Sequence, residues 1–313
     1  MADNSEQLGT KEVNMNPPSV RRIALIGFGE VGAIFGSDFA ASGLDVRVFD
    51  ILLHDEPSRE AMLSNASHAK VHACDSVSAA VQDADLVISA VTASAAIDAA
   101  KEAAPALCRG HIFLDINSVS PQTKREIARV IEPSSASFVE AAVMAPVGPQ
   151  RLRVPMLLGG TDAPEAANLL RLIGMNATPV SDRIGVASAI KMCRSIIIKG
   201  LESLVVESLF AARSHGAEDA VLASLAASYP QMGWTDRLPD YLVSRVAEHG
   251  RRRAAEMREA AQTLKGVGFD PWMALATAER QDWLVNEMAE RDLAYRADEP
   301  FSWRALADSI LSR

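Results

Sequence analysis

Residues 23–32 read Ile-Ala-Leu-Ile-Gly-Phe-Gly-Glu-Val-Gly, an apolar run followed by a G-x-G-x-x-G pattern. The run is typical of a buried strand, and the residues after it predict a helix that begins near Val31 and continues to Ser42. In this strand-turn-helix context the glycines permit a tight turn, close approach of a ligand to the backbone, and close packing of helix on strand. The pattern predicts a site for the pyrophosphate of a dinucleotide at the helix N-terminus, formed by Gly27, Phe28, Gly29, Glu30, Val31 and Gly32.

An acidic residue follows the next predicted strand. Asp50 lies about 20 residues after the glycine motif, where a carboxylate accepts hydrogen bonds from the ribose 2′-hydroxyl of a dinucleotide. Because a 2′-phosphate would face this negative charge, we expect NAD to be the cofactor. NADP remains possible if Arg47 or Arg59 turns toward the phosphate.

From Arg22 to about Pro179, short apolar or β-branched runs alternate with Ala-rich segments. This alternation predicts an α/β domain of the Rossmann type, with a doubly wound and mainly parallel sheet. The expected strands are Ile23–Ile26, Asp45–Phe49, Lys70–Ala73, Leu86–Ala90, His111–Leu114, Ser137–Ala141, Pro155–Leu158 and Ala177–Val180, and later helices are expected to begin near Ser58, Ser76, Ser94, Pro121 and Ala163.

The strand pattern stops at Gly185, and Ile184–His215 reads as one long helix. We predict an all-α C-terminal domain, divided by breakers at Pro230, Pro239, Gly250, Gly266, Gly268, Pro271 and Pro300. The expected organisation is a polar, disordered leader over 1–20, a dinucleotide-binding domain over 21–183, and a helical substrate and dimerisation domain over 184–313.

Composition excludes several classes of partner and site. The formal net charge is −9, and the basic run 251–253 is flanked by glutamates, which predicts a solvated, salt-bridged helix face rather than a nucleic-acid surface. The three cysteines are scattered, so we expect neither a disulfide framework nor a metal site. No apolar run reaches the roughly 18 residues of a membrane span, and no hydrophobic signal core is present. We therefore expect a cytoplasmic protein.

Polar residues follow the fourth and fifth predicted strands. The carboxyl ends of parallel strands meet at one edge of the sheet, where ligands bind in open α/β folds. Thr92, Asn117 and Ser118 are therefore candidates for contacts with the nicotinamide half of the cofactor. The alternative is that they are ordinary loop and helix-capping residues.

Three motifs together resemble the β-hydroxyacid dehydrogenase and 6-phosphogluconate dehydrogenase superfamily, in a branch with its own helical C-terminal domain. They are the glycine motif, the segment 115–121 (Asp-Ile-Asn-Ser-Val-Ser-Pro), and the segment 185–195, Gly-Val-Ala-Ser-Ala-Ile-Lys-Met-Cys-Arg-Ser. The last resembles the superfamily's catalytic stretch G-x-G-x-x-x-K-x-x-x-N. The resemblance implies that Lys191 is the catalytic lysine, and that Ser195 stands in place of the family's asparagine.

Two further departures from the family pattern bear on the substrate. Where the hydroxyacid enzymes carry a Ser-Gly-Gly that holds the substrate carboxylate, this chain has Met144-Ala145-Pro146, which argues against a small 3-hydroxy acid. Ile198 replaces the general-acid glutamate of the sugar-phosphate branch, so decarboxylation of 6-phosphogluconate is not expected. Met144 and Ala145 are nevertheless substrate-site candidates by position.

Chemistry independently favours Lys191, because a lysine among apolar residues loses solvation, and its pKa then falls toward the range of an acid/base. The alternative is a lysine that reaches solvent or makes a structural ion pair. Trp234 and Tyr241 are candidates for the substrate wall. We expect an NAD(P)-dependent dehydrogenase acting on a secondary alcohol or hydroxy acid, and a homodimer formed through the long helix. The alternatives are an imine or ketone reductase and a non-catalytic NAD sensor.

Overall fold

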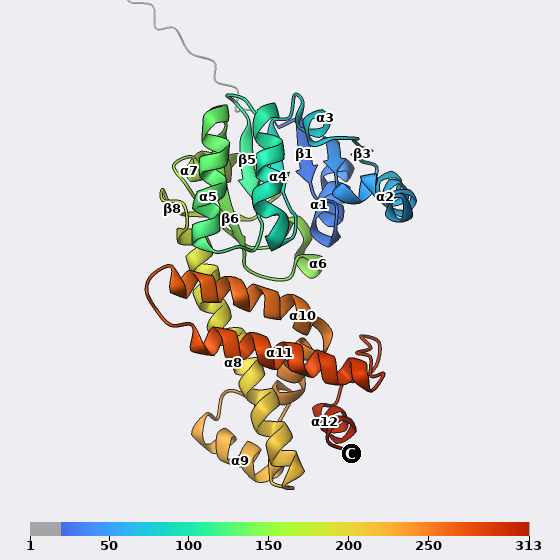
Figure 1. Cartoon of the computed structure of the whole chain (residues 1–313), viewed down its shortest axis with the longest axis vertical. Helices are drawn as coiled ribbons and strands as arrows, with labels where there is room; N and C mark the ends of the chain where they lie inside the picture. Colours follow the sequence, from blue (N-terminus) through green and yellow to red (C-terminus); the bar gives the residue numbers. More distant parts are fainter. Residues whose placement is uncertain (1–19, 313) are drawn as a thin grey trace, which may run out of the picture.

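The computed structural model of the chain describes residues 20–312 and contains the two parts that the sequence predicts (Figure 1). An eight-stranded sheet covered by helices forms the N-terminal part, and the C-terminal part is helical. The leader expected over 1–20 lies almost entirely outside the described residues. Within residues 20–312, none of the helices combines the length and the apolar character needed to cross a membrane.

The sheet has the strand order β3-β2-β1-β4-β5-β6-β7-β8, and among the described strands only β6 and β7 pair antiparallel. The order reverses between β1 and β4, which in doubly wound folds marks the ligand crevice. The predicted strand at Lys70–Ala73 is shorter, because Lys70 takes a left-handed conformation (φ 58°) and ends a helix. The strands are β1 Arg22–Ile26, β2 Asp45–Phe49, β3 His72–Ala73, β4 Leu86–Ser89, β5 Ile112–Asp115, β6 Ser137–Val143, β7 Met156–Gly159 and β8 Ala177–Ser181.

Helices cover both faces of the sheet because successive strand residues point in opposite directions. Ile23 and Leu25 of β1 belong to a core cluster that includes Phe35, whereas Ala24 and Ile26 belong to a second cluster that includes Ile127. The helices of this domain are α1 Glu30–Ala41, α2 Glu56–Ala69, α3 Val77–Val81, α4 Ala96–Ala103, α5 Pro121–Ile131, α6 Val147–Gln150 and α7 Ala163–Leu172.

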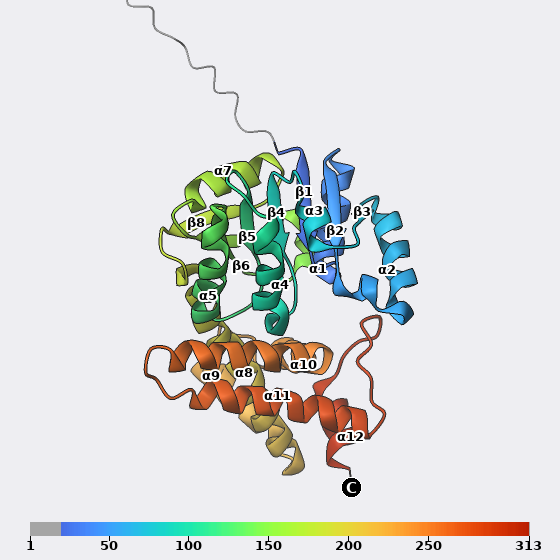
Figure 2. The ribbon, with the colours of Figure 1, turned by 45° about the horizontal axis from the view of Figure 1, so that its top comes forward.

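The helical domain places one long helix between the sheet and the remaining helices. In both views α10 lies between the sheet and α11, while α8 runs away from the sheet past both of them (Figures 1 and 2). The helices are α8 Val186–Ser214, α9 Glu218–Ser228, α10 Leu238–Lys265, α11 Trp272–Glu290 and α12 Trp303–Leu311.

Gly250 was predicted to break a helix, and this prediction is wrong. α10 continues through Gly250, where a Cβ atom would lie 2.5 Å from Val285 Cγ2 and 2.9 Å from the carbonyl oxygen of Gln281. The glycine therefore serves the close packing of α10 on α11 rather than a turn.

Candidate functional site

The carboxyl ends of five parallel strands bring the predicted cofactor residues to one edge of the sheet. The glycine loop follows β1, Asp50 follows β2, Thr92 follows β4, Asn117 follows β5 and Met144 follows β6. The helical domain faces this edge. The backbone N–H of Ser120, after β5, donates to Glu259 of α10 at 2.8 Å, so the two domains are in direct contact there.

The geometry of the glycine loop explains each of its three glycines. Gly27 has φ +96°, and a Cβ there would lie 2.4 Å from the carbonyl oxygen of Ala90. A Cβ on Gly32 would lie 2.2 Å from the carbonyl oxygen of Gly27. By contrast, Gly29 faces open space directly before the first turn of α1, which a phosphate can approach.

Asp50 ties the glycine loop to the end of β2. Its carboxylate accepts hydrogen bonds from the backbone N–H of Phe28 at 2.7 Å and of Leu52 at 3.0 Å. Beside it lies an open hollow of about 570 Å³, which extends from Gly29 and Asp50 to Asn65 and His68 of α2. This size suits a small-molecule site. The open backbone at Gly29, the hollow and the acidic residue at its wall together fit the phosphates and adenosine of a dinucleotide.

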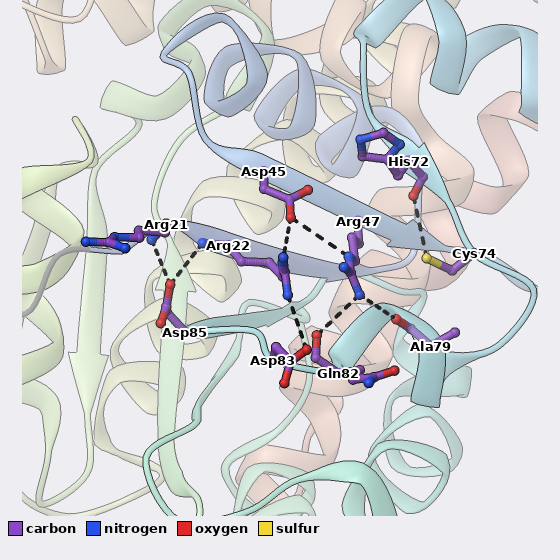
Figure 3. A network of polar contacts seen from close by, with 10 residues as sticks. All are labelled: Arg21, Arg22, Asp45, Arg47, His72, Cys74, Ala79, Gln82, Asp83 and Asp85. Atoms are coloured by element: carbon purple, nitrogen blue, oxygen red, sulfur yellow. Dashed lines mark hydrogen bonds and ion pairs between the residues drawn. The ribbon is translucent and has the colours of Figure 1, made fainter.

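The two arginines considered for binding a 2′-phosphate have other partners. Arg47 points toward the amino ends of the strands, where it donates to the carbonyl oxygens of Ala79 and Gln82 at 3.4 Å and lies 4.0 Å from Asp45 (Figure 3). Arg59 donates to the carbonyl oxygen of Leu53 at 2.6 Å and lies 3.6 Å from Asp75. Neither arginine is paired with Asp50.

The side chain of Asn117 bridges two strand ends. Its Oδ1 accepts a hydrogen bond from the backbone N–H of Val91 at 2.7 Å, and its Nδ2 donates to Ser89 Oγ at 2.9 Å. Asn117 is buried, so its amide holds the ends of β4 and β5 together.

The neighbouring candidates differ in how their hydroxyl groups are bonded. Thr92 is exposed and its Oγ1 shares a hydrogen bond with Ser94 Oγ at 3.2 Å, whereas the buried Oγ of Ser118 has no hydrogen-bond partner among the described residues. Met144 and Ala145 are half-buried at the end of β6. A buried hydroxyl without a partner is costly, so a ligand that bonds Ser118 Oγ would relieve this cost.

A buried carboxylate fixes the start of α8. Glu140 of β6 accepts hydrogen bonds from the backbone N–H of Gly185 at 2.6 Å and of Ala187 at 3.1 Å, and from Ser188 Oγ at 2.8 Å. Gly185 itself has φ +102°, which favours glycine. The first turn of α8 is thereby anchored to the sheet, and Lys191 follows one turn later.

Lys191 begins a polar stripe on α8 that continues through Ser195, Lys199 and Glu202. Lys199 Nζ donates to Ser195 Oγ at 3.1 Å and lies 2.7 Å from the carboxylate of Glu256 in α10. Lys199 therefore makes an ion pair, while Lys191 has no ion pair within 4.0 Å among the described residues.

Burial between the two domains lowers the pKa of Lys191 to about 8. The carboxylate of Glu256 opposes this decrease, and the positive charges of Lys124, Lys199 and Arg252 add to it. Burial raises the pKa of Glu256, but the charge and hydrogen bond of Lys199 together with the charges of Lys191 and Arg252 outweigh burial, so the net shift is downward. The site thus holds an ionised carboxylate beside a lysine that titrates near neutral pH.

The basic run 251–253 does not form the wholly solvated face that was predicted. Arg253 is 13% exposed and lies 3.1 Å from the buried Glu202, whose pKa burial raises to about 7. Arg252 lies 3.5 Å from Glu30 of the glycine loop and 4.0 Å from Glu256. The run is partly covered because α10 packs against both α8 and the domain that contains the sheet.

Sequence reasoning missed Lys124 and gave no account of what Glu256 and Arg252 do. Lys124 of α5 is 1% exposed, donates to the carbonyl oxygen of Asp115 at 2.7 Å, and lies 3.2 Å from the carboxylate of the same residue. No local pattern identifies such a lysine, because only the fold brings α5, α8 and α10 to one place.

The two aromatic candidates do not join this group. Trp234 is buried in the distal core of the helical domain, in the cluster that contains Val205 and Leu209. Tyr241 is 59% exposed near the start of α10. Within residues 20–312 no cluster of His, Cys, Asp and Glu is arranged to hold a metal ion.

Comparison with known proteins gives two matched domains. Residues 22–179 match the NAD binding domain of 6-phosphogluconate dehydrogenase, and residues 212–284 match a domain of unknown function, DUF1932. A conserved hypothetical protein from Sinorhizobium meliloti 1021 shares 34% identity over 94% of this chain and 97% of its own, with a TM-score of 0.77.

Two further relatives are related by name to hydroxyacid dehydrogenases. A conserved protein of unknown function, described as structurally similar to 3-hydroxyacid dehydrogenases, shares 32% identity over 85% of this chain and 97% of its own, with a TM-score of 0.69. The mitochondrial 3-hydroxyisobutyrate dehydrogenase of Drosophila melanogaster is 25% identical over 223 residues, which are 70% of this chain and 66% of that enzyme.

Proposed function

We propose that this chain, which belongs to the family that shares the NAD binding domain of 6-phosphogluconate dehydrogenase, is a dehydrogenase. Its proposed substrate is a secondary alcohol or hydroxy acid. The match to this family confirms the resemblance drawn from the motifs, and it supports an NAD(P)-dependent oxidoreductase. The direction of the reaction and the substrate are part of the proposal.

One observation carries the proposal: a half-buried lysine with a pKa near 8 stands on the helix that leads away from the carboxyl edge of the sheet. A nicotinamide held at that edge would accept the hydride that leaves the carbon bearing the hydroxyl. As that C–H bond breaks, the neutral amine of Lys191 accepts the hydroxyl proton, and the carbon–oxygen double bond forms. In the reverse direction the ammonium of Lys191 returns the proton to the oxygen.

Ser195 is suited to orient the substrate oxygen. Its Oγ accepts a hydrogen bond from Lys199, so its own hydrogen is free to donate to another oxygen. Because Lys199 is paired with Glu256, it holds Ser195 in place and is unsuited to act as the acid/base itself. We assign the proton transfer to Lys191 and a positioning role to Ser195.

The test is turnover with a defined panel of substrates. Absorbance of the reduced nicotinamide should rise when NAD⁺ and the correct secondary alcohol or hydroxy acid are added, and the panel should include large and weakly anionic members. We include these because apolar Met144 and Ala145 occupy the positions where related enzymes hold a carboxylate. Binding of NAD⁺ without turnover across the whole panel would contradict the proposal and favour a sensor.

A further inference from the structure

An ion pair between the two domains lies at the phosphate-binding turn. Arg252 of α10 reaches Glu30, the first residue of α1, at 3.5 Å, and both side chains are more than half exposed. Glu30 directly follows Gly29, the residue that faces open space. A guanidinium of the helical domain thus stands beside the turn that receives the pyrophosphate.

The carboxylate of Glu30 poses an electrostatic problem for a bound dinucleotide. With no ligand present, the helix dipole favours an acidic residue in the first turn of α1. A pyrophosphate brings further negative charge to the same turn, and like charges at close range repel. Arg252 is the cation that the structure places closest to Glu30 among the described ion pairs.

The ion pair is easily exchanged. Exposed pairs of this kind contribute little to stability, because solvent screens the charges and both side chains lose freedom. The guanidinium presents a planar fork of donors that suits phosphate oxygens, and its long side chain allows it to turn. Its second carboxylate neighbour, Glu256, lies 4.0 Å away on the same helix, outside hydrogen-bond distance.

We propose that Arg252 is a cofactor-binding residue supplied by the helical domain, which leaves Glu30 and bonds the pyrophosphate when the dinucleotide binds. The inference rests on the nicotinamide cofactor of the proposed function. It assigns to the helical domain a direct part in holding the cofactor. When the cofactor binds, Arg252 thereby exchanges its contact with Glu30 for a contact with the pyrophosphate at the same turn.

The test compares Arg252→Gln with Arg258→Gln by isothermal titration calorimetry. Arg258 is a matched control, since it lies on the same helix, is 53% exposed against 54% for Arg252, and pairs with Asp282 at 2.5 Å. Arg252→Gln should weaken NAD⁺ binding about tenfold or more, the size expected for a lost charge-assisted bond. Adenosine, which lacks phosphates, should bind both variants and the parent equally. Unchanged NAD⁺ affinity in Arg252→Gln overturns the proposal.

A second variant distinguishes a cofactor contact from a simple strut between domains. Glu30→Gln frees Arg252 and removes a negative charge, so NAD⁺ should bind as tightly as in the parent or more tightly. If Glu30→Gln weakens binding as much as Arg252→Gln does, the pair acts only as a strut, and the proposal fails. A parent protein that binds no NAD⁺ would overturn the cofactor assignment as well. A parent that binds NAD⁺ but turns over no substrate would contradict the dehydrogenase function alone.

Discussion

Glu140 Oε1 accepts a hydrogen bond from the backbone N–H of Gly185 at 2.6 Å, and so joins a central strand to the helix that carries Lys191. Glu140→Ala would leave the N–H groups of Gly185 and Ala187 without this acceptor. We expect the free energy of unfolding to fall by about 3 kcal/mol, since buried donors lose bonds to a charged group. Urea unfolding followed by circular dichroism measures this loss. Ser188→Ala, which removes one donor only, should cost about 1 kcal/mol. Equal losses in the two variants would show that Glu140 is not the main anchor.

Removal of Lys191 should abolish turnover without unfolding the protein. Lys191→Ala should lose at least about a hundredfold in kcat, because a positioned acid/base contributes that much or more. Lys191→Arg should be almost as inactive, since a guanidinium stays protonated and is unable to accept the proton. Steady-state kinetics and NAD⁺ affinity are measured together, with the exposed Lys101→Ala as control. A Lys191→Ala variant that retains more than about a tenth of the parent rate rules out the assignment.

The rate should depend on pH through Lys191. Alcohol oxidation needs the neutral amine, so kcat/KM should rise with pH and level off above about 8, whereas carbonyl reduction needs the ammonium and should decline above about 8. The carboxylate of Glu256 raises the pKa of Lys191, and the charges of Lys124, Lys199 and Arg252 lower it. Glu256→Gln should therefore move both inflections to lower pH. An inflection that stays in place or moves upward in this variant would contradict the role of Lys191.

Asp50 should set the choice of cofactor. NAD(H) is expected to bind at least about tenfold more tightly than NADP(H), because a 2′-phosphate would lie against this carboxylate. Asp50→Ala should narrow or reverse the ratio of dissociation constants. Since Asp50 also accepts bonds from Phe28 and Leu52, Asp50→Asn serves as the variant that retains an acceptor while removing the charge. Equal affinities for both cofactors in the parent would show that an arginine changes partner to bind the phosphate.

An apolar stripe on α8 leads us to propose a homodimer. Ile190, Ile197 and Leu204 recur at seven-residue spacing on one side of the helix, and they are 40%, 71% and 54% exposed. Exposed apolar stripes of this kind mark protein interfaces. Light scattering at micromolar concentration should show a dimer, and Ile197→Glu with Leu204→Glu should give monomers. Leu172→Glu, at a site 66% exposed in the other domain, should leave the dimer intact. A monomeric parent protein would rule the dimer out.

Local patterns predict the parts of the fold that depend on neighbours in the chain. The glycine loop was predictable because strand, turn and helix follow one another directly in the chain. The long helix was expected over 184–215, and α8 spans Val186–Ser214. Gly250 was misjudged because the reason for the glycine lies on another helix. The amide of Asn117 bonds groups at the end of β4, a contact between distant residues that no local pattern reveals, and its predicted contact with the cofactor stays a prediction.

The ion pairs of the site were also not predictable from local sequence patterns, because their partners lie on different helices. The pair of Lys199 with Glu256 and the pair of Arg252 with Glu30 join residues far apart in the chain. Helical spacing puts Ser195 and Lys199 on the same side of α8 as Lys191, yet this spacing does not tell which helix packs against that side. The identity of the opposing charges, and hence the pKa of Lys191, follows only from the packing of α10.

The hydrogen bonds from the first turn of α8 to Glu140 fix that end of the helix to the sheet. At 29 residues the helix is about 43 Å long, and Lys191 lies only about 9 Å along it from Gly185 at the fixed end. A tilt of about 10° about that point would carry the far end roughly 7 Å but the lysine less than about 2 Å. A rotation of the outer helices about the first turn of α8 would therefore move the Lys191 amine far less than it moves the far end of the helix.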